Sequence, residues 1–160
     1  MKHQWATLTV KRIKLDVVIS HAPWRQAIPR LVVFTRSVLA AIPFPPDANG
    51  HTLVVAYIDD AAQQQLNRQF RGKDKPTNVL SFPGDVGLEH LGDIALAYET
   101  IQREAQAANV PIAAHLAHLL VHGALHLQGY DHEHDTDAAV MMQKEVEILA
   151  RLDYTDPYAA

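Results

Sequence analysis

The sequence contains no cysteine. Disulfide bonds, thiolate metal sites and cysteine nucleophiles are therefore excluded, and any bound metal must be held by histidine, aspartate or glutamate side chains. The chain has 160 residues, 48% of them hydrophobic. A chain of this size and composition can bury a core without disulfide or metal support, and we expect one domain spanning residues 1–160.

Long uninterrupted hydrophobic runs are also missing. A membrane-spanning helix needs about 18 or more consecutive apolar residues, whereas the most apolar stretch here, residues 112–127, carries four histidines. The N-terminal segment is interrupted by Lys11, Arg12, Lys14 and Asp16, and it lacks the pattern of a secretory signal peptide. These features predict a cytoplasmic protein that does not enter a membrane.

The sequence has no excess of basic residues, because 14 Lys and Arg stand against 18 Asp and Glu, a formal net charge of −4 at pH 7. Such a chain produces no overall field that attracts nucleic acid. A polyanionic partner would therefore need a local basic patch.

Hydrophobic periodicity and turn residues predict a small α/β domain. Strands are expected at residues 14–20, 51–58, 78–82 and 91–97. Helices are expected at residues 24–42, 60–70, 98–108 and 111–128 and from residue 135 onward. This alternation predicts an α/β (α+β) fold in which about five helices flank a small mixed sheet of about four strands.

Individual residues mark the ends of these helices. Pro29 is expected in the true first turn of the 24–42 helix. Asp59 or Asp60 is expected to cap the 60–70 helix, and Gly129 is expected to end the 111–128 helix with a positive φ.

The last predicted helix is amphipathic. The residues expected to form its apolar stripes are Val140, Met141, Ile148 and Leu152, with Met142 as a further core residue. The residues expected to face water are Asp137, Lys144, Glu145 and Glu147.

Six of the ten histidines fall between positions 115 and 134. His122 and His126 are four residues apart in a predicted helix, so their imidazoles lie one above the other and can bind the same ion. Gly129 lets the chain turn back after the helix, so that His132 can reach the same point. We therefore predict one divalent metal ion, with zinc favoured by imidazole ligation, although nickel, copper and iron accept the same ligands.

The full spacing, HxxxHxxGxxH, is the one used by metzincin proteases, whose general base is a glutamate directly after the first histidine. Here that position is Gly123, so a peptidase lacks its base. Three neutral imidazoles leave the full charge of the ion in place, and a water bound in such a site can have a pKa of about 7. A positively charged open site favours an anionic substrate such as a phosphodiester over a peptide.

A basic loop follows the 60–70 helix. Arg71, Lys73 and Lys75 form the densest cationic run outside the N-terminus. Arg71 can bind a phosphate through two N–H donors, whereas for Lys73 and Lys75 an exposed solvated loop is an equally good interpretation. Asp131 is a candidate acceptor for a ligand imidazole, and Glu133 is a candidate proton shuttle.

Three motifs together resemble a known family. They are HGALHLQGYDH (His122–His132), RGKDKPTNVLSFP (Arg71–Pro83) and LGDIALA (Leu91–Ala97), and in this set they resemble the YbeY family. The tail DYTDPY (Asp153–Tyr158) is similar as well. The similarity runs from roughly Leu53 to the C-terminus, while the N-terminal third matches only in general character.

The resemblance implies a bacterial, cytoplasmic, zinc-dependent endoribonuclease that is specific for single-stranded RNA. It implies action on ribosomal RNA precursors, notably at the 3′ end of the small-subunit RNA, and a part in ribosome quality control. Carried over residue by residue, it places the metal ligands at His122, His126 and His132 and the arginine of RNA cleavage at Arg71. Because the chain is mildly acidic and lacks aromatic-rich stacking motifs, we expect the ribosome or its associated proteins to supply much of the substrate positioning.

Alternatives of other classes stay open. One is another metal hydrolase, either a small phosphoesterase or, less favoured because of Gly123, a peptidase. Another is a ribosome assembly factor with a chiefly structural metal, for which His118 is the helix residue that can complete a closed four-histidine shell. Otherwise His115, His118 and His134 are expected to have helix-face or surface roles. For the nuclease, either water or the ribose 2′-hydroxyl can be the attacking group.

Overall fold

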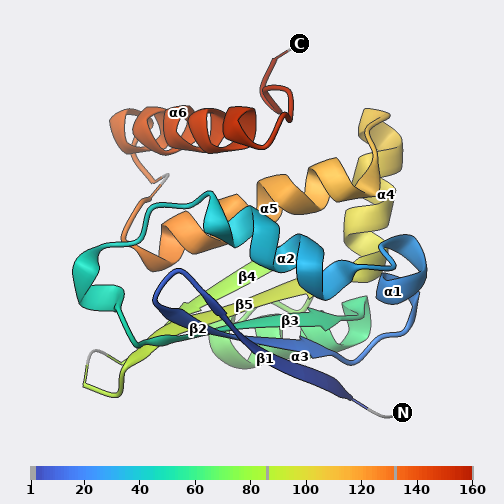
Figure 1. Ribbon diagram of the computed structural model, residues 1–160. Coiled ribbons are helices and arrows are strands. Elements are labelled where there is room, and N and C mark those ends of the chain that lie inside the picture. The colour runs from blue at the N-terminus through green and yellow to red at the C-terminus, as the bar shows by residue number, and fades with distance from the viewer. Residues whose placement is uncertain (1–2, 86, 132, 160) are drawn as a thin grey trace.

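The computed structural model describes residues 3–85, 87–131 and 133–159. The elements in these ranges are β1 (Gln4–Val10), β2 (Ile13–Ile19), α1 (Pro23–Ala27), α2 (Leu31–Ala40), the 3₁₀ turn η1 (Pro46–Ala48), β3 (Thr52–Ile58), α3 (Asp60–Arg71), β4 (Val79–Pro83), β5 (His90–Ala97), α4 (Tyr98–Ala108), α5 (Ile112–Leu127) and α6 (Asp135–Arg151). The predicted fold class is confirmed, because helices flank a mixed sheet (Figure 1).

The sheet has five strands in the order β1-β2-β3-β5-β4. β2, β3 and β5 are parallel to one another, while β1 and β4 run antiparallel to their neighbours and form the two edges. The carboxyl ends of the three parallel strands therefore lie together. β4 has a neighbour on one side only, which leaves its outer side available to side chains from other elements.

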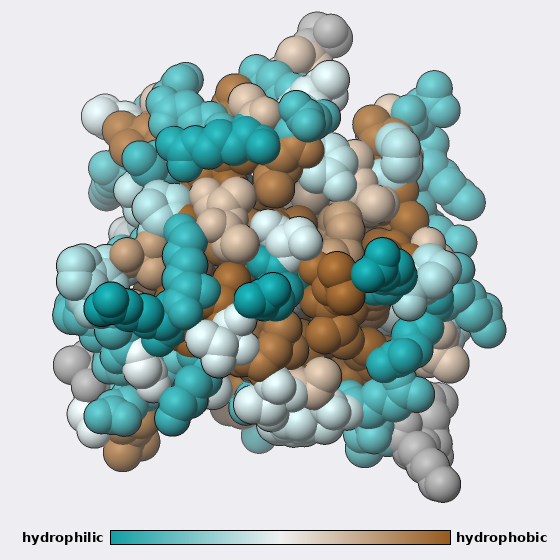
Figure 2. Space-filling model, in the orientation of Figure 1, coloured by the Kyte–Doolittle hydropathy of each residue, from teal (hydrophilic) through white to brown (hydrophobic). Residues whose placement is uncertain are grey.

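The helices form layers on both faces of the sheet (Figure 1). α2 and α5 cover one face and α3 covers the other, while α6 lies beyond α5, away from the sheet. The main core lies between the sheet and α2 and α5, where residues such as Leu15, Val55 and Leu120 are fully buried. Hydrophilic residues cover much of α6 on the face shown in Figure 2, as expected for an outer helix.

α5 is the central helix of the fold. Half of its 16 residues are buried, which explains why its composition is so apolar. Among the described helices, none is long and apolar enough to cross a membrane alone, and α4 and α5 meet that test only as a pair with a bend of 117° between them.

The fifth strand, β1, was not expected from the sequence. It pairs with β2 along its full length through a two-residue connection at Lys11 and Arg12, and Lys11 has a positive φ of 54°. Two-residue hairpins usually carry Asn or Gly at such positions. Because neither residue is present here, the turn gave no hairpin signal in the sequence.

The helix predicted at residues 24–42 is wrong as a single element, because it is divided into α1 and α2. α1 ends before Ile28, whose φ of −134° and ψ of 90° are not helical. The next residue is Pro29, which disfavours helical backbone in the residue before it and lacks an N–H to donate. α2 begins two residues after the proline.

Other helix ends follow the sequence. The Asp59 carboxylate caps α3 by accepting the Ala62 N–H at 2.8 Å, and Gly129 has the expected positive φ of 94°. Both residues act within one turn of their helix, which is why sequence patterns locate them.

The orientation predicted for α6 is wrong at three positions. Glu145 was expected to face water but is fully buried, while Val140 and Met142, expected in the core, are 55% and 39% exposed. The buried stripe of α6 consists of Met141, Glu145, Ile148 and Leu149. These four residues have regular helical spacing, so Glu145 belongs to the buried face by position. The prediction was wrong because it placed Glu145 on the solvent side from its polarity alone.

Candidate functional site

α5 presents a column of histidines. His122 and His126, one turn apart, have ring centroids 4.9 Å apart and an interplanar angle of 78°. The predicted placement of the two rings on one face of the helix is confirmed, while their role as metal ligands stays a prediction. The third predicted ligand, His132, lies outside the described residues, and among the described residues no group of three His, Asp or Glu side chains is placed to hold a metal ion. The three-histidine centre therefore stays a prediction.

His122 is oriented by a buried carboxylate of α6. Glu145 Oε1 lies 2.6 Å from His122 Nδ1, and the Tyr158 hydroxyl donates a hydrogen bond to Glu145 Oε2. Burial by itself would raise the pKa of Glu145, but hydrogen bonds from His118, His122 and Tyr158 outweigh that effect and lower the pKa to about 2. The carboxylate is therefore ionised near neutral pH.

The charge state of Glu145 fixes the tautomer of His122. An ionised carboxylate can only accept, so His122 Nδ1 carries a proton, and in the neutral imidazole the lone pair is then on Nε2. A neutral imidazole backed by a carboxylate is the usual form of a metal-ligating histidine. The described residues supply two imidazoles, those of His122 and His126, which are donors that divalent transition metals accept, and Nε2 of His122 would be one ligand.

Sequence reasoning missed both Glu145 and Tyr158. The available signals were a carboxylate within the stripe of Met141, Ile148 and Leu149, and the DYTDPY tail that contains Tyr158. The acceptor at His122 Nδ1 is Glu145, and the role of Asp131 as an acceptor for a ligand imidazole stays a prediction.

His118 supports the same carboxylate. Its Nε2 lies 3.1 Å from the Tyr158 hydroxyl and 3.6 Å from Glu145 Oε1. This position next to the carboxylate does not favour His118 as a fourth metal ligand. His115 is also engaged elsewhere, since its Nε2 lies 2.8 Å from Glu104 Oε1.

A cavity of about 630 Å³ lies along the edge strand β4. His122 and His126 line it from α5, and Arg71 lines it from the end of α3. Four further candidates from the sequence line it too; they are Lys73, Lys75, Asp131 and Glu133. The fold thus brings the basic loop and the histidine helix, which are far apart in the sequence, to one cavity.

The end of α3 places Arg71 at this cavity. Gly72 follows with a φ of 69°, a left-handed conformation that glycine adopts without strain. The side chain of the buried Asn67 then donates to the Lys75 carbonyl at 2.9 Å, which holds the loop against the helix. The cationic loop is therefore shaped by contacts with its own helix.

The guanidinium of Arg71 is held against β4. Its Nη2 donates to the Ser81 carbonyl at 2.8 Å, and its Cζ lies 5.7 Å from the centroid of the Phe82 ring. A guanidinium has five N–H donors in a planar fork. One bond to the strand edge orients the group while other donors can meet an anion in the cavity.

Gly123 occupies a close contact between α5 and the sheet. Ser81 Oγ donates to the Gly123 carbonyl at 3.2 Å. A Cβ on Gly123 would lie 3.0 Å from Ser81 Oγ and 3.1 Å from Ile94 Cγ2. These contacts are tighter than ordinary packing, so Ser81 and Ile94 would have to shift by a few tenths of an ångström to admit a glutamate at the position of the metzincin base.

A family model described as Endoribonuclease YbeY matches residues 17–153. The chain belongs to the YbeY family. The resemblance inferred from the three motifs is thereby confirmed, and the match extends to β2, α1 and α2, where the motifs gave little guidance.

Three YbeY relatives cover most of the chain, each named Endoribonuclease YbeY. The protein of Rhodopseudomonas palustris is 47% identical over 152 residues, which cover 90% of this chain and 80% of the relative. That of Sphingopyxis alaskensis is 47% identical over 156 residues, with 86% and 93% covered. That of Maricaulis maris is 41% identical over 145 residues, with 90% and 91% covered.

A solved structure supports the fold alone. The solution structure of a Thermotoga maritima protein aligns with a TM-score of 0.55 at 24% identity and covers 92% of this chain and 99% of that one.

Proposed function

We propose that this YbeY-family chain is an endoribonuclease that cleaves single-stranded RNA in the cavity beside β4. The names of its relatives support the reaction class. The observation that carries the proposal is the placement of Arg71 and the pair His122 and His126 around one cavity. As its cellular role we propose cytoplasmic processing of ribosomal RNA precursors, notably at the small-subunit 3′ end, together with ribosome quality control in contact with the ribosome or its associated proteins.

A divalent metal ion, with zinc favoured, is part of this proposal. His122 and His126 would hold it together with His132, the third ligand inferred from the sequence. When bound, the ion would act as a Lewis acid toward the phosphate and make water more acidic. Glu145 and Tyr158 would position His122 for that task.

The described residues divide the remaining work. Cleavage replaces one ribose–phosphorus ester bond by a bond from phosphorus to the attacking oxygen, and negative charge grows on the phosphoryl oxygens during this exchange. Arg71 would stabilise that charge through its N–H donors. Lys73 and Lys75 would bind neighbouring phosphates, and Glu133 would carry a proton between the attacking or leaving oxygen and water.

The test is cleavage of an end-labelled, single-stranded ribosomal RNA precursor fragment, alone and annealed to a complementary strand. We expect the single strand to be cut, the duplex to resist, and chelation to stop cleavage until zinc is restored. Equal cleavage of single strand and duplex would contradict the substrate preference. Cleavage that survives complete metal removal would contradict the metal.

The attacking group needs a separate measurement. A fragment methylated at the 2′-oxygen of the cut position is still cleaved if water attacks, whereas cleavage at that position disappears if the ribose hydroxyl attacks. The neighbouring unmethylated positions in the same fragment serve as the control.

A further inference from the structure

An aromatic side chain beside the cavity is unusually exposed. Phe70 lies in the last turn of α3, directly before Arg71, and is 59% exposed. Phe70 is not among the residues that form the main core or pack against it. An exposed ring next to a cationic residue is a common way to bind an unpaired base.

The ring of Phe82 packs against Phe70. The centroids of Phe70 and Phe82 are 5.4 Å apart, with the planes inclined by 61°. Phe82 is partly buried and packs against the small cluster of Ile58, Leu80 and Ala95 on the α3 side of the sheet. Phe82 is therefore anchored, and its edge contact with Phe70 holds the outer ring while leaving much of it open to solvent.

A basic residue, Arg71, lies next to this aromatic pair and also lines the cavity. The guanidinium of Arg71 lies against Phe82, and Arg71, Lys73 and Lys75 line the cavity. If a phosphate of a single-stranded RNA binds to these cations, the neighbouring bases of that RNA can reach the adjacent aromatic rings. The combination of a cationic track and an open aromatic ring is complementary to single-stranded nucleic acid.

We infer that Phe70, supported by Phe82, is a stacking platform for one unpaired base next to the phosphate held by Arg71. The inference rests on the proposed function and adds a base-binding subsite to it. Stacking needs an exposed base, so the platform would favour single strands over duplex. It would not distinguish strongly among bases, because each base has a π-face.

The experiment combines removal of the ring with removal of bases. A single-stranded RNA of ten nucleotides is compared with a set in which one base at a time is replaced by an abasic site. Dissociation constants are measured by fluorescence anisotropy on metal-depleted protein, and kcat/KM is measured on the metal-loaded protein. The protein variants are Phe70→Leu, Phe70→Tyr and, as a matched exposed aromatic on the opposite sheet edge, Trp5→Leu.

We expect one abasic position to weaken binding by wild-type protein by roughly five- to fiftyfold. Phe70→Leu should bind the intact RNA more weakly than wild type by a similar factor. Its dissociation constant should not change further when the base at that position is removed. Phe70→Tyr should stay within about twofold of wild type because the ring remains. Trp5→Leu should behave as wild type.

Salt dependence separates stacking from a loss of cationic contacts. Phe70→Leu should leave the slope of log Kd against log salt unchanged, whereas Lys73→Ala should reduce it by about 0.7 if that residue neutralises one phosphate. A reduced slope in Phe70→Leu would mean that Arg71 had moved, and it would overturn the stacking assignment.

Other outcomes separate the two proposals. If wild-type protein cuts RNA but no abasic position affects binding, the platform is wrong and the nuclease stands. If Phe70→Leu weakens intact and abasic RNA equally, Phe70 has a packing role or serves a protein partner, and the platform is again wrong. If wild-type protein neither binds nor cuts the RNA, the proposed function itself fails.

Discussion

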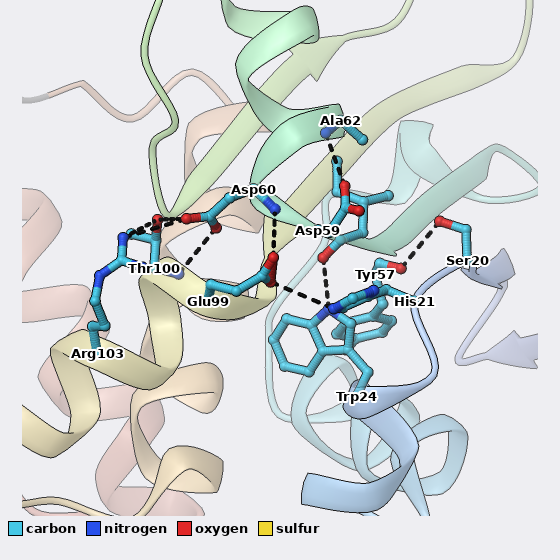
Figure 3. A network of polar contacts seen from close by, with 11 residues as sticks. Ser20, His21, Trp24, Tyr57, Asp59, Asp60, Ala62, Glu99, Thr100 and Arg103 are labelled. Carbon is cyan, nitrogen blue, oxygen red and sulfur yellow. Dashed lines mark hydrogen bonds and ion pairs between the residues drawn. The ribbon is translucent and has the colours of Figure 1, made fainter.

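Two clusters in which histidine meets several polar side chains, carboxylates among them, use these groups differently. One is the histidine site on α5. The other lies at the carboxyl ends of the parallel strands β2, β3 and β5, where Figure 3 shows His21, Asp59, Asp60 and Glu99 converging. Residue types alone would make both of them candidates for a functional site.

In the second region the carboxylates cap helix N-termini. Asp60 accepts the Thr100 N–H at 3.0 Å and the Thr100 hydroxyl at 2.8 Å, near the start of α4. Glu99 in turn accepts the Asp60 N–H at 3.3 Å, at the start of α3, and pairs with His21 at 3.5 Å. Each helix thus supplies a carboxylate to the N-terminus of the other, a stabilising use of negative charge.

At the histidine site, by contrast, the buried carboxylate of Glu145 from α6 is directed at an imidazole of α5. Glu145 stabilises one tautomer of His122, whose ring lines a cavity that also contains cations. The comparison teaches that a polar cluster is functional when its hydrogen bonds orient a group toward a cavity, and structural when they satisfy the backbone. Four substitutions test that distinction, from the largest expected effect to the smallest.

His126→Ala should abolish both metal binding and RNA cleavage, because one of the proposed ligands is removed. Metal content by elemental analysis and cleavage of the labelled fragment are read on the same sample. The control is His115→Ala. His115 lies on the same helix as His126, and its side chain is bonded to Glu104 of α4. Full metal stoichiometry in the His126→Ala protein would defeat the ligand assignment.

Arg71→Ala should keep the metal and lower kcat by roughly 10²- to 10³-fold, because a donor to the developing charge is lost. Arg68→Ala, an exposed arginine on the same helix that pairs with Asp74 at 4.0 Å, should stay close to wild type. Arg71 has no part in the reaction if both variants cut at the same rate.

Glu145→Gln should weaken metal binding by roughly 10- to 100-fold, since it removes the charged acceptor behind His122. Excess zinc should restore cleavage, because the groups lining the cavity remain. Tyr158→Phe should shift affinity in the same direction by less, and Glu147→Gln, an exposed neighbour on α6, should not shift it. Zinc titrations measure all three, and an unchanged affinity for Glu145→Gln would remove its positioning role.

Asp60→Ala should leave kcat/KM within about twofold of wild type while lowering the free energy of unfolding by about 1–2 kcal/mol, the usual cost of a lost helix cap. Denaturant titration at constant pH measures the change. Asp47→Ala, at an exposed carboxylate, should change stability by no more than about 0.5 kcal/mol. A large loss of cleavage in Asp60→Ala would show that the second region also serves the reaction.

Sequence reasoning succeeded where the cause is local. The spacing of His122 and His126 predicted two rings on one helix face, Gly129 predicted a positive φ, and Asp59 predicted a cap. Each depends on backbone geometry within one or two helical turns. His132 stays a sequence prediction, because it lies outside the described residues.

Sequence reasoning failed where a distant segment decided the outcome. β1 forms an edge strand through a turn that lacks the usual residues, and Glu145 is buried because α6 packs against α5. A carboxylate is normally exposed unless a partner compensates its desolvation. Here the partners are His122 and Tyr158, and nothing in the local pattern of α6 names them.

The sequence by itself determined the family, the alternation of strands and helices, and the histidine pair on α5, because motifs and periodicity are properties of neighbouring residues. Only the tertiary structure decided that β4 is an edge strand, that Arg71 meets the histidines across it, and that Glu145 stands behind His122. Those relations join residues far apart in the chain, and they exist only once the sheet order and the packing of α5 and α6 are set.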